Sequence, residues 1–135
     1  MDARIEIVLA LIGRDIRAKH ESRALATHVR LSVSRFYDLF RHETGTVPAR
    51  YIHMRRLEDA KGLLLNSHLS VKEIADRVGI QDMSHFVRDF QRQYGLSPRR
   101  FRREFITSSQ VYHGAQEDSL TNRNFRQQII SQSKG

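Results

Sequence analysis

The chain has 135 residues and a formal net charge of +8 at neutral pH, from 23 Lys and Arg against 15 Asp and Glu. This length allows one domain or two small subdomains. The absence of cysteine excludes disulfides, cysteine-ligated zinc and cysteine nucleophiles. So basic a chain favours an anionic partner such as a nucleic acid. No stretch approaches the ~20 apolar residues of a membrane span, so we expect a cytoplasmic protein with no membrane partner.

Apolar residues recur at three- and four-residue steps along most of the chain, which is the spacing of amphipathic helices. The first such stripe runs from Ile5 to Ile16. The segment 22–45 follows as two helices around a short turn. Its second helix has Ser32 as a suitable N-cap and Gly45 as a suitable stop.

A long helix is predicted over 48–66, because Pro48 is well tolerated in a first helical turn. The segment 70–95 then repeats the pattern of two helices around a turn, and Ser70 and Glu73 form a capping-box motif at its start.

The composition changes near the end of the chain. A last helix is expected over about 97–105. From residue 107 to 135, Ser, Gln, Asn and Gly dominate, which predicts a polar, disordered tail. We therefore expect the folded domain to span 1–106.

Two segments of the chain repeat one another. Aromatic, glycine and proline positions recur 50 residues later in the pairs Phe36 and Phe86, Phe40 and Phe90, Gly45 and Gly95, and Pro48 and Pro98. Each copy has the pattern of a helix-turn-helix, whose second helix enters a DNA major groove. A helical bundle with a duplicated hairpin is the plainer alternative.

Charge favours the DNA-binding interpretation. Residues 22–50 hold five basic against two acidic residues, and residues 70–106 hold eight against five. We predict an all-α, homeodomain-like fold of about seven helices, in which the helix over 48–66 joins two helix-turn-helix subdomains. That helix is about 28 Å long, and successive major grooves on one face of DNA lie about 34 Å apart. One chain could therefore reach two grooves.

The second copy contains the stretches SVKEIADRVGI and SHFVRDFQRQYGLSPRRFR. With them, residues 5–105 resemble the AraC/XylS family of bacterial transcription regulators. The resemblance implies a sequence-specific regulator on the bacterial nucleoid that activates more often than it represses and acts on RNA polymerase at a promoter. Many members carry a separate sensor domain, for which 135 residues leave no room; a fragment of a larger regulator is one interpretation. The chain is similar instead to short members that bind double-stranded DNA as monomers, here a site of about two helical turns, with neither a cofactor nor a small-molecule effector.

Base contacts are expected from the outward side of the second helix of each copy, since its phenylalanines take the core side. The candidates are Ser34, Arg35, Tyr37, Asp38, Met83, Ser84, Val87 and Arg88. Arg88 is the strongest, because a bidentate contact from Arg to guanine is the commonest specific contact. A phosphate contact or a pair with Asp89 is its alternative. Met83 and Val87 could touch thymine methyl groups or simply pack locally.

Asp38 departs from the family, whose members often carry Arg or another donor at this position. It could accept a hydrogen bond from a cytosine amino group, orient Arg35 or Arg41, or repel phosphate; we favour orientation. Tyr37 could reach a phosphate or a base, or pack partly against its neighbours.

Phosphate contacts are expected at helix N-termini and at the basic residues beside them. The candidates are Ser32, Arg41, Arg50, Asp82, Arg99 and Arg100. For Arg56, in the linking helix, the resemblance implies a structural role that bridges the two halves.

We expect neither a metal site nor an enzyme. The seven histidines are scattered with no i,i+4 pair, and motifs for phosphate loops or a nucleophilic serine are missing. Two other functions stay open: an adaptor with one head on DNA and the other on a protein, and a non-specific binder of nucleic acid.

Overall fold

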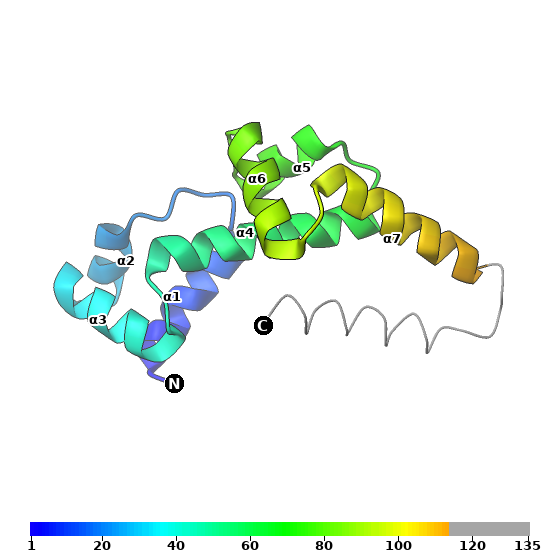
Figure 1. Cartoon of the computed structure of the whole chain (residues 1–135). Coiled ribbons are helices and arrows are strands. Elements are labelled where there is room, and N and C mark those ends of the chain that lie inside the picture. Colours follow the sequence, from blue (N-terminus) through cyan, green and yellow to red (C-terminus); the bar gives the residue numbers. More distant parts are fainter. Residues whose placement is uncertain (114–135) are drawn as a thin grey trace.

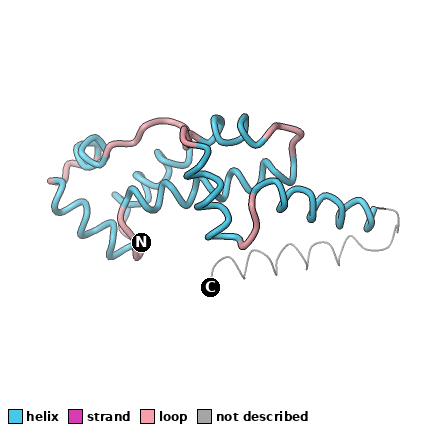
Figure 2. The backbone as a smooth tube through the Cα atoms, turned by 45° about the horizontal axis from the view of Figure 1, so that its top comes forward, coloured by secondary structure: helices cyan, strands magenta, loops and turns pink. Residues whose placement is uncertain are grey.

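The computed structural model describes the backbone of residues 1–113 and the side chains of residues 1–106. This part of the chain holds seven helices and no strand: α1 (Ala3–Arg14), α2 (Ser22–His28), α3 (Val33–Thr44), α4 (Pro48–Asn66), α5 (Val71–Val78), α6 (Met83–Tyr94) and α7 (Pro98–His113). Figure 1 shows α4 in the middle, with α1 to α3 at one end and α5 to α7 at the other. The tube of Figure 2 shows the same two groups. The predicted all-α fold with two helix-turn-helix units is confirmed.

Two hydrophobic cores share α4. Near the start of α4, Ile52 packs with side chains of α1, α2 and α3, of which Ile5, Val8, Ile12, Phe36 and Phe40 are fully buried. We call this unit, residues 3–52, the first head. The second head, residues 57–106, contains the second core.

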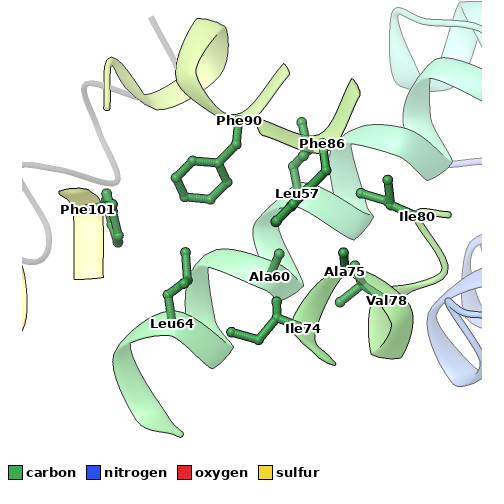
Figure 3. Packing of buried hydrophobic residues seen from close by; sticks show 10 residues of the cluster. All are labelled: Leu57, Ala60, Leu64, Ile74, Ala75, Val78, Ile80, Phe86, Phe90 and Phe101. Carbon is green, nitrogen blue, oxygen red and sulfur yellow. The ribbon is translucent and has the colours of Figure 1, made fainter. Parts of the chain in front are cut away.

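The second core is built on the later turns of α4. Leu57, Ala60 and Leu64 project from α4 toward α5, α6 and α7 (Figure 3). They meet the buried side chains of Ile74, Ala75, Val78, Ile80, Phe86, Phe90 and Phe101. Because one helix contributes to both cores, each head is tied to the other through α4.

The helix ends follow local sequence signals. Ser32 and Asp82 each accept a hydrogen bond from the backbone N–H three residues later, at 3.2 and 3.0 Å. Ser70 and Glu73 form the predicted capping box, with bonds of 3.1 and 3.2 Å. Three helices end at a glycine with positive φ, namely Gly45 (78°), Gly79 (88°) and Gly95 (83°). These caps fix where α3, α5 and α6 begin and end.

The last helix is longer than the sequence suggested. It was expected over about 97–105, whereas α7 continues to His113. No glycine or proline interrupts the chain between Pro98 and Gly114, so nothing in the backbone chemistry stops the helix earlier. The rest of the expected tail, 114–135, lies outside the described residues. None of the described helices is long and apolar enough to cross a membrane.

Candidate nucleic-acid interface

The outward face of α6 forms a shallow surface hollow. Phe86 and Phe90 are fully buried on the core side of this helix. The opposite side presents Met83, Ser84, Val87, Arg88 and Gln91, which line the hollow together. The structure thus brings together all four base-contact candidates of the second head, and Gln91 joins them. Met83 is half-buried and also packs against the second core.

Arg88 keeps an exposed guanidinium on this face. Its Nε lies 3.9 Å from Oδ1 of Asp89, and 59% of the side chain is exposed. The other carboxylate oxygen of Asp89 is 2.9 Å from Nε2 of His53, on α4. The anticipated pair of Arg88 with Asp89 therefore exists, but Asp89 is held more closely by His53. Arg88 stays accessible to a ligand.

The first head carries different side chains at four of the five equivalent positions of α3, and Ser34 alone matches its counterpart, Ser84. Val87 of the second head corresponds to Tyr37, whose hydroxyl lies 3.1 Å from Oγ of Ser22 in α2. The Tyr37 ring also stands edge-on to Phe36, with ring centres 6.2 Å apart. The partial packing considered for Tyr37 is therefore present. Ser34 and Arg41, also on α3, are exposed.

Arg35 and Asp38 lie on a second hollow of the first head. Its lining residues are Arg4, Leu31, Arg35, Asp38, Leu39 and His42. In the described part of the chain, Asp38 forms no ion pair with Arg35 or Arg41. The expected orienting role of Asp38 is thus not seen. Its carboxylate is exposed on the outward face of α3.

Most of the phosphate-contact candidates lie at helix starts, whereas Arg41 lies in the last turn of α3. Arg50 lies in the first turn of α4, and Arg99 and Arg100 lie in the first turn of α7; all three are exposed. Arg100 also pairs with Glu104 at 3.4 Å. Free backbone N–H groups at these starts add partial positive charge. The helix that follows each copy of the repeat, α4 or α7, therefore begins with partial positive charge and has arginine in its first turn.

Asp82 differs from the other phosphate-contact candidates because it is an anion. The N–H of His85 donates to its carboxylate, and this bond lowers the pKa of Asp82 below its usual value, with a smaller contribution from the charge of His85. The ionised carboxylate caps α6 and would repel a phosphate. At this helix start the carboxylate does not suit an anion, but the backbone N–H groups do. Ser32 also caps its own helix by accepting a hydrogen bond, but its hydroxyl can still donate to a phosphate.

Arg56 bridges the two heads, as the resemblance implied. From α4, its Nε donates to the carbonyl of Ile16 at 2.9 Å, and its Nη2 donates to the carbonyl of Ala18 at 3.0 Å. Burial lowers the pKa of Arg56 from its usual value. Its guanidinium also faces Gly79 at the end of α5.

Sequence reasoning missed three residues of this surface. Arg4 and His42 line the hollow beside α3, and His53 holds Asp89 of α6. Arg4 sits on α1, whose position against α3 depends on the packed core and has no local sequence signal. His42 follows Asp38 by one helical turn, so the spacing along α3 could have identified it.

The comparisons with known proteins agree with this geometry. A family model described as a helix-turn-helix domain matches residues 25–104. The uncharacterized HTH-type transcriptional regulator YdiP of Escherichia coli (strain K12) is 36% identical over 104 residues, which cover 77% of this chain and 34% of YdiP. The transcriptional activator RhaS of Escherichia coli O139:H28 is 33% identical over 100 residues, 74% of this chain and 36% of RhaS. The chain therefore spans about a third of the length of these curated relatives.

One solved structure shows a similar domain on DNA. The crystal structure of the DNA-binding domain of AdpA, a global transcriptional factor, in complex with a target DNA has 29% sequence identity and a TM-score of 0.73. The match covers 80% of this chain and 96% of the AdpA chain. Together, the family match and the two repeated heads assign the chain to the AraC/XylS family of helix-turn-helix transcription regulators.

Proposed function

We propose that this chain binds a specific double-stranded DNA site with both heads and regulates transcription from a nearby promoter on the bacterial nucleoid. In this mechanism α3 and α6 enter two successive major grooves on one face of the duplex. The observation that carries the proposal is the pair of recognition helices, each capped and each presenting an outward face, on opposite ends of α4.

The dimensions support two grooves rather than one. α4 has 19 residues and is therefore about 28 Å long. Successive major grooves lie about 34 Å apart along straight DNA. Because the spacing of the heads is set by a shorter helix, we expect the DNA to bend toward the protein.

The two heads offer different side chains to the DNA bases. The second head offers the exposed Arg88 for guanine and the methyl-bearing Met83 and Val87 for thymine. The first head offers Ser34, Arg35 and Asp38, while the Tyr37 hydroxyl is held by Ser22. We propose that arginines at the starts of α4 and α7 hold phosphates and set the register of both heads.

The two-groove arrangement determines the expected stoichiometry. One chain carries both reading helices, so we propose that it binds as a monomer.

The regulatory effect is a separate step. A surface contact with RNA polymerase next to the site would raise or lower promoter activity. Activation is the favoured direction, since RhaS, which this chain resembles, is named as an activator.

The test is selection of bound sites from random DNA, followed by footprinting of the best site at several salt concentrations. We expect a site of about two helical turns with two protected major grooves on one face. Two matched variants at the same repeat position, Arg41→Glu on α3 and Gln91→Glu on α6, should each erase protection of one groove only. Loss of both grooves in either variant, or a single protected groove in the parent chain, would contradict the proposal.

Two further readouts separate the alternatives. Transcription in vitro with purified polymerase and the selected site tests the regulatory contact, and the mass of the complex tests the one-to-one stoichiometry. An affinity that collapses with salt, with no enriched site, would leave only a non-specific basic binder.

A further inference from the structure

The turn of the second helix-turn-helix rests directly on the backbone of the first head. Gly79 ends α5 and has no side chain. A Cβ placed on it would lie 2.9 Å from the carbonyl oxygen of Arg17 and 3.1 Å from its Cα. Atoms at such distances overlap, so only glycine permits this approach. Residue 17 belongs to the α1–α2 connection, far from residue 79 in sequence.

Three polar contacts stabilise the same region. Arg56 donates to the carbonyls of Ile16 and Ala18, on either side of Arg17. The guanidinium of Arg17 reaches Asp76 of α5 at 3.3 Å. We call the set Arg17, Arg56, Asp76 and Gly79 the junction. It is a second connection between the heads, in addition to α4.

Comparison with the first copy of the internal repeat indicates why residue 79 is glycine. Its equivalent in the first turn is Arg30, which also has a positive φ of 60°. A side chain is therefore compatible with the backbone of this turn. The second copy needs glycine because the Arg17 backbone lies against it, which the φ value alone does not explain.

The junction lies close to the reading helix. Asp82, the N-cap of α6, follows Gly79 by three residues, and a cleft of about 500 Å³ beside the junction is lined by both. A displacement at Gly79 would therefore move the start of α6 relative to the first head. Without the junction, α4 would be the single link between the two cores, and a single helix can bend. The junction connects the heads at a second place, between the α1–α2 connection and α5.

We propose that the junction fixes the separation of α3 and α6, so that the protein selects DNA by the spacing between its two boxes. This inference rests on the proposed function, since spacing has a meaning only for two bound grooves. In it, Arg56 and Gly79 are positioning residues that touch no DNA. They act through the placement of the two recognition helices.

The first experiment measures the separation of the heads without DNA. The chain has no cysteine, so spin labels at Arg23→Cys in α2 and Lys72→Cys in α5, both exposed, report one distance. We expect a narrow distance distribution in the parent chain, a shifted one in Gly79→Ala and a broadened one in Arg56→Ala. Unchanged distributions in both variants would overturn the proposal.

Matched controls separate the junction from general damage. Gly95→Ala has the same backbone strain, at φ 83°, but nothing lies within 4 Å of the added Cβ. Arg102→Ala removes a similar clamp on two carbonyls, of Leu64 and Ser67, inside the second head. Both controls should keep the parental distance. If Gly79→Ala fails to fold, Arg56→Ala still decides.

The second experiment varies the spacing of the selected DNA site by one base pair in either direction. We expect the parent chain to lose about tenfold or more in affinity, and Arg56→Ala to lose at most a few-fold. Altered distances with an unchanged spacing preference would overturn the specificity role. If the parent chain has no two-box site at all, the proposed function fails, while the label distances still report whether the junction is rigid.

Discussion

Asp38 of α3 and Arg88 of α6 hold the same position of the internal repeat, and both are exposed on the outward face of their helices. The scaffold around them is matched, with buried phenylalanines on the core side of each helix. The two heads therefore present opposite charges at an equivalent place. Two different boxes, rather than a repeated one, are expected in the DNA site.

Arg88→Ala should weaken binding to the selected site by about 1–3 kcal/mol, because it removes the proposed contact to guanine. Specificity should relax at one base pair of one groove. Arg88→Lys is the decisive control, since it keeps the charge and loses the planar fork. Titrations against the site and its single-base variants make the measurement. If Arg88→Lys binds like the parent chain, Arg88 contacts phosphate only.

Asp38→Asn should change base preference in the groove that we propose α3 enters. The exposed carboxylate of Asp38 is suited to accept a hydrogen bond from a cytosine amino group. In Asn, an NH2 donor replaces one of the two acceptor oxygens. We expect the affinity ratio between the selected base and its alternatives to fall by about tenfold, within the range of one mismatch. A uniform rise in affinity for every sequence would instead show that Asp38 only repels phosphate.

Much of this architecture could be predicted because it is local. The caps at Ser32, Ser70 and Asp82 depend on side chains that bond to the nearest turn. The repeat of Phe36 and Phe86 likewise needs only the helical period and the spacing between copies.

The rest depends on parts of the chain that meet only after folding. Gly79 could be predicted as a helix stop, but its contact with the Arg17 backbone could not. The hydrogen bond of Tyr37 to Ser22 joins two helices whose crossing is set by the core. The missing pair between Asp38 and its neighbouring arginines is a matter of side-chain direction, which spacing does not determine.

Arg30→Gly should stabilise the folded chain. Arg30 has a φ of 60°, and a non-glycine residue in this region costs about 1 kcal/mol or more. We expect the free energy of unfolding to rise by about 1 kcal/mol. Part of this gain is offset because glycine raises the conformational entropy of the unfolded chain. Urea unfolding measures the change. Arg30→Ala keeps the strain and serves as the control, and an equal gain in both variants would implicate charge rather than backbone.

Asp82→Ala should destabilise the chain near neutral pH, and the difference from the parent should shrink in acid. The pKa of Asp82 is lowered below 3.8 by the N–H of His85. A lowered pKa means that the stabilisation is present above the unfolded value and is lost as pH falls through the folded value. Asp82→Asn keeps an acceptor without the charge, so its stability should vary less with pH. Urea unfolding from pH 7 to pH 3 makes the measurement, and a difference that grows in acid would contradict the capping role.

Tyr94→Phe should also stabilise the second head. The Tyr94 hydroxyl is buried with no hydrogen-bond partner among the described residues. Its repeat equivalent, Thr44, instead donates to the carbonyl of Phe40 at 2.8 Å. An unsatisfied buried hydroxyl costs about 1–3 kcal/mol, whereas the ring under Lys61, 4.7 Å from its Nζ, is retained in phenylalanine. We expect a gain of about 1 kcal/mol at pH 7.

The pH dependence of Tyr94→Phe provides an independent check. Burial raises the pKa of Tyr94 above 10.0, and the charges of Glu58 and Asp59 raise it further. A tyrosine with a raised pKa contributes stability below its unfolded value that is lost as pH rises. The parent chain should therefore lose stability above about pH 10, and Tyr94→Phe should lose less. Unfolding free energies from pH 7 to pH 11 measure both effects. A destabilised Tyr94→Phe at pH 7 would mean that the hydroxyl has a partner in solution.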